Sequence, residues 1–167
     1  MFGRLDAMSQ LAYPKKSHRK SIRYPQECAK LAELLGIIFG DGGLTDTQVK
    51  ISLNAKADAA YSTFVKYLFE ELFAIKVFLQ KRERQNTLVI VCSSTNLVDF
   101  LVQKGAVRGN KISQQMGIPD WVLRETLYSR TFVGGPVDTD GCLYTNTEYL
   151  AIPIKTSAFA LPAICYP

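Results

Sequence analysis

Two segments of this chain share a pattern that strongly restricts how it can fold. Each is an apolar, glycine-containing stretch that ends at an Asp-Gly pair: residues 34–42 read LLGIIFGDG, and residues 133–141 read VGGPVDTDG. Glycine inside a helix costs about 1 kcal/mol relative to alanine, so Gly36 and Gly40, four residues apart on one face, predict a helix that another backbone approaches closely. Gly135 holds the equivalent place in the second segment.

Asp41 and Asp140 would then fall at the carboxyl ends of these two helices. The helix macrodipole disfavours an anion at this end unless a cation offsets it. Two such carboxylates brought together would attract a divalent metal. For either segment alone, the ordinary interpretation is a C-terminal cap or a turn. The repetition of the pattern at a domain-sized interval favours a functional pair.

The paired segments resemble the signature of the LAGLIDADG homing endonucleases, in which two such helices pack side by side and each delivers an acidic residue to a metal-dependent DNA cleavage site. Residues 109–111 (GNK) followed by 118–122 (IPDWV) are similar to the connector that many two-repeat members carry before their second signature helix. The resemblance covers about residues 25 to 145.

The resemblance implies an α+β fold: an αββαββα unit with an antiparallel, saddle-shaped sheet, plus a partial second repeat. The domains would be a basic N-terminal arm (1–25), a first repeat with its connector (26–128) and a truncated second repeat (129–167). The implied function is site-specific hydrolysis of double-stranded DNA with Mg²⁺ or another divalent metal. On this match Asp41 and Asp140 are catalytic residues and metal ligands, and Gly36, Gly40 and Gly135 pair the helices. Lys50, Lys81 and Lys111 are candidate active-site lysines, which the sequence does not rank.

The body of the chain predicts the elements of such a unit. Helices are expected at about 27–40, 56–73 and 96–104, and a hairpin at 76–84 and 86–93. Alternating residues predict a strand at 49–53, and a short segment after Gly43 must supply the remaining strand. In the helix at 56–73, helical spacing predicts these core residues: Tyr61, Phe64, Val65, Leu68, Leu72 and Phe73.

One face of the expected sheet is polar, with side chains that can make bidentate contacts to base edges in the major groove. Its candidate DNA-binding residues are Lys50, Ser52, Asn54, Gln80, Arg82 and Arg84. The alternative is an ordinary solvated sheet surface, because antiparallel sheets commonly leave one face wet.

The distribution of charge and cysteine narrows the function classes. Residues 1–26 hold six Lys or Arg against Asp6, and this surplus of five equals the net charge of the whole chain, +5. Such a tail either attracts phosphates or is a solvated arm. The 4 cysteines form no C-x-x-C pair, and the 1 histidine, His18, lies in this tail. This distribution argues against a zinc site and against histidine-dependent catalysis.

The longest apolar stretch is far below the ~20 residues that span a bilayer. An intracellular location, cytoplasmic with the nucleoid or organellar, is therefore expected, without a membrane partner.

Two departures from the family pattern leave the activity open. Pro136 stands in the middle of the second signature helix, where proline costs about 3 kcal/mol and a kink would misplace Asp140. Only 26 residues follow Gly141, so the second repeat is expected to lack its own sheet. Three interpretations remain: a decayed or prematurely stopped endonuclease, a homodimer paired through Gly36 and Gly40 rather than a monomer with a pseudo-twofold axis, or a non-catalytic DNA-binding or RNA-splicing (maturase-like) accessory protein.

Overall fold

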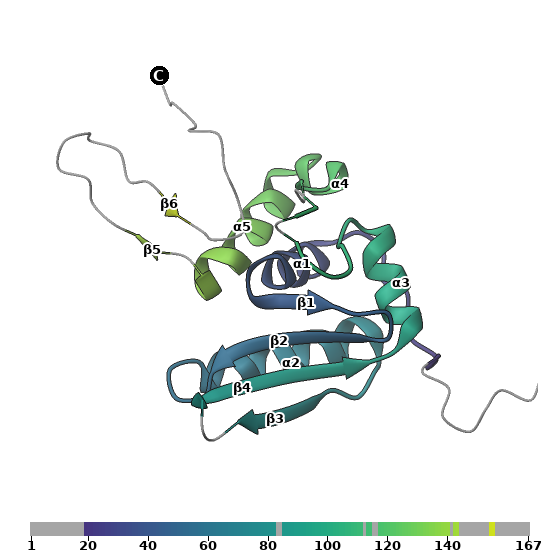
Figure 1. The fold of residues 1–167 in the computed structure, drawn as a ribbon. Helices are drawn as coiled ribbons and strands as arrows, with labels where there is room; N and C mark the ends of the chain where they lie inside the picture. Colours follow the sequence, from purple (N-terminus) through teal and green to yellow (C-terminus); the bar gives the residue numbers. More distant parts are fainter. Residues whose placement is uncertain are drawn as a thin grey trace, which may run out of the picture.

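The chain alternates helices and strands in the predicted order. The computed structural model describes residues 19–82, 85–111, 113–114, 117–140, 142–143 and 154–155, with side chains up to Pro136. The first elements are α1 (Ala29–Asp41), β1 (Gly42–Leu44), β2 (Gln48–Asn54), α2 (Ala59–Phe73), β3 (Phe78–Arg82), β4 (Thr87–Ser93) and α3 (Thr95–Gln103). This αββαββα order confirms the predicted α+β unit, and the strand expected after Gly43 is present as β1 (Figure 1).

The first four strands form one antiparallel sheet in the order β1-β2-β4-β3. Along β2, buried Val49, Ile51 and Leu53 alternate with more exposed neighbours, as expected when one face of a strand packs on a core. Ile51 lies opposite Ile90 of β4, and both side chains belong to the core. This core-facing side is the inner face of the sheet, and the opposite side is the outer face.

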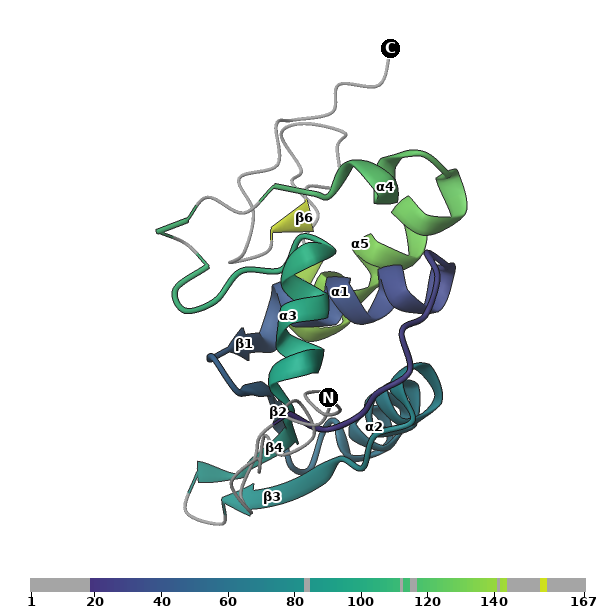
Figure 2. The ribbon, with the colours of Figure 1, turned by 90° about the vertical axis from the view of Figure 1, so that its right-hand side faces the viewer.

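Helix α1 is buried over most of its surface, from Leu34 to Gly40 on every side. Its fully buried side chains, each at most 1% exposed, are Leu31, Ala32, Leu34, Leu35, Ile37, Ile38 and Phe39. A helical stretch that is apolar all round, as residues 34–40 are, needs neighbours on every side. The sheet and α2 cover one side of α1, and helix α5 covers another (Figures 1 and 2).

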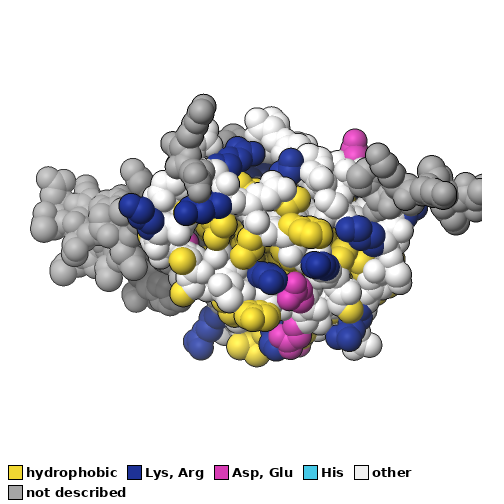
Figure 3. Space-filling view, turned by 90° about the horizontal axis from the view of Figure 1, so that it is seen from below, with side chains coloured by type: hydrophobic (Ala, Val, Ile, Leu, Met, Phe, Trp, Pro, Cys, Tyr) yellow, Lys and Arg dark blue, Asp and Glu magenta, His cyan; other side chains and the backbone are white. Residues whose placement is uncertain are grey.

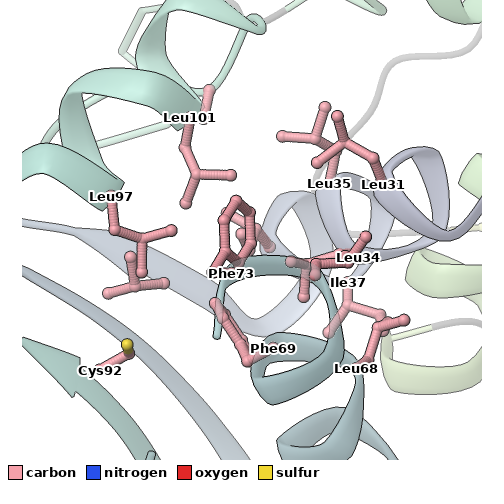
Figure 4. Close-up of a cluster of buried hydrophobic side chains, with 14 of the residues drawn as sticks. Leu31, Leu34, Leu35, Ile37, Leu68, Phe69, Phe73, Cys92, Leu97 and Leu101 are labelled. Atoms are coloured by element: carbon pink, nitrogen blue, oxygen red, sulfur yellow. The ribbon is translucent and has the colours of Figure 1, made fainter. Parts of the chain in front are cut away.

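Helix α2 fills the space beneath α1, but with a different aromatic residue from the one predicted. Phe69 is fully buried, whereas Phe64 is 42% exposed and therefore is not a core residue. Val65, Phe69 and Phe73 recur every four residues on one face of the helix, and Phe64 lies beside that row. Phe69 and Phe73 point toward leucines of α1 and α3 (Figure 4).

Residues just before α1 are attached to the body of the protein. Ile22 is 8% exposed and belongs to the core. The backbone N–H of Arg23 donates to the carbonyl of Phe73 at 2.8 Å, and Asn96 Nδ2 donates to the carbonyl of Lys20 at 2.9 Å. The end of the predicted basic arm therefore packs against α2 and α3, while residues 1–18 lie outside the described residues.

After α3, a connector leads to α4 (Asp120–Leu123) and α5 (Thr126–Asp140). Trp121 in α4 is 6% exposed and donates its Nε1–H to the carbonyl of Lys104 at 3.0 Å. Of the strand predicted over 142–154, the structure describes β5 (Cys142–Leu143) and the first residue of β6 (Ile154–Lys155), and these two short strands pair antiparallel. Residues 144–153 lie outside the described residues. Within the described residues, no helix is both long and apolar enough to cross a bilayer.

Candidate functional site

The backbones of α1 and α5 touch at two glycines. A Cβ atom added at Gly36 would lie 2.0 Å from the carbonyl oxygen of Phe132. One added at Gly135 would lie 2.4 Å from the backbone nitrogen of Ile37 and 2.6 Å from the carbonyl carbon of Gly36. Real Cβ atoms do not approach backbone this closely, so any larger residue requires the helices to separate. By contrast, an added Cβ at Gly134 meets nothing within 4 Å.

The two helices run in the same direction. Near their starts, Tyr128 Oη donates to the carbonyl of Glu27 at 3.2 Å, and further along both helices the backbone of Gly135 lies against Gly36 and Ile37. The rings of Phe39 and Phe132 also meet edge to face, at 5.0 Å between centroids. Asp41 follows Gly36 by five residues and ends α1, just as Asp140 follows Gly135 by five residues and ends α5. At 1.5 Å rise per residue, both helices end about 7.5 Å beyond their contact. The backbones of the two acidic positions therefore lie at the same end of the pair, although the side chain of Asp140 lies outside the described residues.

Pro136 does not break α5, which continues to Asp140. Proline has no amide hydrogen for the carbonyl four residues earlier, which here belongs to Phe132. That same carbonyl lies against Gly36, where the missing side chain gives it room. Pro136 and the Gly36 contact thus both involve one group, the carbonyl of Phe132.

Lys111 binds the carboxyl end of α1. Its ammonium group donates to the carbonyls of Ile38 at 3.3 Å and Phe39 at 2.9 Å, and also to that of Gly40. The three N–H groups of an ammonium match these three carbonyls. A cation at this position offsets the negative end of the macrodipole next to Asp41, which is partly buried. Gly40 is itself buried in α1.

The loop that carries Lys111 is fixed to the sheet and to α3. The N–H of Gly109 donates to the carbonyl of Leu44 in β1 at 2.8 Å, and the backbone of Gly109 has a positive φ of 80° that favours glycine. Arg108 pairs with Asp99 of α3 and, at 3.9 Å, with Asp46 of the β1–β2 turn. These contacts hold the lysine in place at the end of α1.

The other two candidate lysines lie elsewhere. Lys50 is exposed on β2 opposite Gly43, on the strand next to the one that follows Asp41. Lys81 lies on β3, three strands away from β1, which corresponds to about 14 Å at ordinary strand spacing. It is paired with Leu88, and Leu88 with Leu53, so Lys81 belongs to the inner-face row. The structure does not bring Lys81 together with Asp41.

The outer face of the sheet collects the remaining predicted residues. Strand pairing places three cross-strand rows on it: Lys50–Val91–Phe78, Ser52–Val89–Gln80 and Asn54–Thr87–Arg82. Directly opposed residues of antiparallel strands point to the same face, so all the candidates except Arg84, which lies outside the described residues, share one surface. Sequence reasoning missed Phe78, although the alternation of Phe78, Gln80 and Arg82 along β3 was a signal for it.

Asn54 already has structural partners. Its side-chain oxygen accepts from the backbone N–H groups of Lys56 at 3.0 Å and Ala57 at 3.1 Å, and from Asn86 Nδ2 at 3.1 Å. This oxygen would be needed for a bidentate contact with adenine. Asn54 therefore shapes the turn before α2 and is a poor candidate for reading a base.

The charge of the sheet is of one sign. None of the residues in β1, β2, β3 or β4 is Asp or Glu, whereas Lys50, Lys81 and Arg82 are exposed. Seen from below, the molecule shows Lys and Arg side chains spread among apolar ones, with few acidic side chains (Figure 3).

Two further groups bear on the chemistry. Burial raises the pKa of the Cys92 thiol to about 12, so this cysteine is a core residue and not a nucleophile at neutral pH. Among the residues that the structure describes, no three His, Cys, Asp or Glu side chains come together as a metal-binding group.

Comparison with known proteins finds a similarity of three-dimensional structure. A scan against protein-family models found no match, and neither did a search of curated proteins. Among solved structures, the chain is similar to the crystal structure of I-DmoI in complex with DNA and Mn, with 19% sequence identity and a TM-score of 0.47. The matched region covers 68% of this chain and 63% of that one, so the chain spans less than two thirds of the length of I-DmoI.

Proposed function

We propose that this chain is a site-specific double-stranded DNA endonuclease of the LAGLIDADG homing-endonuclease type. The observation that carries the proposal is the parallel pair of α1 and α5, whose backbones touch at Gly36 and Gly135 and whose last residues are Asp41 and Asp140. This contact lies five residues before the aspartate of each helix. It therefore holds the two acidic helix ends near each other, as a shared metal site would require.

The outer face of the sheet would bind the duplex. Phosphate contacts from lysine and arginine supply affinity that falls as salt rises, while polar side chains in the groove supply sequence preference. Lys50, Gln80 and Arg82 share this face, and the strands carry no acidic residue that would repel phosphates. Because β1 directly follows Asp41, the DNA-binding sheet and the acidic helix end belong to one continuous segment.

The donor chemistry at the helix ends fits a divalent cation. Mg²⁺ is held in proteins by one or two carboxylates together with substrate phosphates and waters, so Asp41 and Asp140 would be the ligands. When bound, the metal would activate a water and stabilise charge on the leaving oxygen. The chain's own contribution is to fix the helix ends: the glycine contact sets their separation, and Lys111 holds the end of α1.

Cleavage and binding can be tested separately. The full chain would be incubated with a plasmid library of random inserts, with and without Mg²⁺, and linear products sequenced. We expect Mg²⁺-dependent cutting at a defined site, a loss of at least about 100-fold in Asp41→Asn and in Asp140→Asn, and salt-sensitive duplex binding retained in both. Asp120→Asn is the matched control, because Asp120 is an exposed carboxylate at the start of α4.

A wild-type chain that binds duplex DNA but cuts no insert would overturn the nuclease and support the non-catalytic binding protein. Preferential binding to a folded RNA over any duplex would instead support the splicing accessory. Neither result depends on the stability of the variants, because both concern the unmodified chain.

A further inference from the structure

Phe78 is an exposed aromatic residue on the surface that would contact DNA. It opens β3 and lies opposite Val91 of β4, which in turn lies opposite Lys50 of β2. The three side chains therefore form one row on the outer face. The next residue, Leu79, lies opposite the core residue Ile90 and so belongs to the inner face.

The members of this face differ in how much apolar surface they offer. Val89 and Val91 of the central strand are only 3% and 6% exposed, whereas Phe78 is 47% exposed. The ring of Phe78 is thus the main apolar group that a ligand on the described strands of this face could reach. The ammonium group of Lys76 lies 5.6 Å from the centroid of the ring, so a positive charge accompanies it.

We propose that Phe78 contacts the 5-methyl group of a thymine in the major groove and so selects thymine at one position of the target. The proposal rests on the proposed DNA-binding function of the sheet. In the major groove, thymine is the one base of the four that presents a methyl group, and an apolar side chain discriminates by covering that methyl. Lys76 beside the ring supplies attraction to the phosphates that flank the base.

The size of the effect follows from the area of one methyl group. Burying one methyl-sized group strengthens binding about fourfold, so removal of that methyl should weaken binding by about the same factor. Deoxyuridine is thymidine without the methyl group and keeps the same hydrogen-bonding edge. It therefore isolates the apolar contact from every polar one.

The experiment first selects duplexes from a randomised library with the full chain, and then replaces each thymine of a selected duplex by deoxyuridine, one at a time. For the wild-type chain, one replacement should weaken binding about fourfold. For Phe78→Ser, the same replacement should have no effect, because the side chain that covers the methyl is gone. Phe64→Ser is the matched control: Phe64 is 42% exposed, but on α2, and this variant should keep the fourfold ratio.

Thermal melting checks that each variant is folded. Phe78→Val, which keeps a residue of high strand propensity at this position, provides a second test if the serine variant is unstable. Its shorter side chain should lose most of the discrimination. If Phe78→Ser and Phe78→Val discriminate as strongly as the wild type, the thymine contact is wrong while duplex binding stands. If the library yields no salt-sensitive duplex at all, the proposed function fails as well, and the thymine contact with it.

Discussion

Helices α1 and α5 carry similar sequence patterns, yet they occupy different environments. Leu34 and Val133 each precede their contact glycine by two residues, but Leu34 is fully buried and Val133 is 38% exposed. Leu127, near the start of α5, is 57% exposed. The sheet and α2 enclose the side of α1 that faces away from α5, whereas described contacts of α5 are made chiefly with α1. The comparison teaches that a shared motif fixes the helix contact, while the neighbouring layers decide how much each helix contributes to stability.

The largest expected effect comes from removing the contact that the two helices share. Gly36→Ala should lower the free energy of unfolding by about 3 kcal/mol or more, because its Cβ would overlap the Phe132 carbonyl and force the backbones apart. Urea unfolding monitored by circular dichroism measures this change. Gly134→Ala is the matched control in α5, where open space and better helix propensity should raise stability by up to about 1 kcal/mol. Equal urea midpoints for the two variants would contradict the backbone contact.

The second prediction addresses the difference in burial directly. Leu34→Ala should cost about 2–5 kcal/mol, as expected for a leucine removed from a closed core. Val133→Ala, at the equivalent position of α5, should cost less than about 1 kcal/mol. The same unfolding measurement applies to both. Similar losses at the two positions would mean that α5 is as enclosed as α1 in solution.

The smallest effect concerns the carboxyl end of α1. Lys111→Met keeps the length of the side chain but removes the hydrogen bonds to the carbonyls of Phe39 and its neighbours, and should cost about 1 kcal/mol. Lys50→Met, on the exposed sheet face, should change stability by less than about 0.5 kcal/mol. Amide hydrogen exchange in the last turn of α1 should increase in Lys111→Met alone. Unchanged exchange there would show that the lysine does not hold the helix end.

Much of the fold could be predicted because it depends on local periodicity. The alternation of Val49, Ile51 and Leu53 gives β2 correctly, since residues two apart in a strand face the same side. The predicted helices and the hairpin agree with α1, α2, α3, β3 and β4 within a few residues. Which phenylalanine of α2 is buried could not be predicted in this way, because Phe64 and Phe69 both fit an apolar helical pattern. The position of the neighbouring helices decides that Phe69 is the core residue.

The candidate site divides in the same way. The glycine and aspartate positions follow from the repeated pattern, and their catalytic and metal-binding roles remain predictions. The separation of Lys81 from Asp41, the structural use of Asn54 and the binding of Lys111 to the end of α1 could not be read from the sequence. Each depends on which distant segments the fold brings together.

The sequence by itself determined where helices and strands form and where two backbones can touch, because glycine, apolar spacing and alternation act on a few neighbouring residues. The tertiary structure alone decided which helix is enclosed, which lysine meets the end of α1 and which aromatic ring stays exposed on the sheet. These outcomes depend on burial and hydrogen bonding between segments far apart in the chain. A local sequence pattern does not determine which of those segments come into contact.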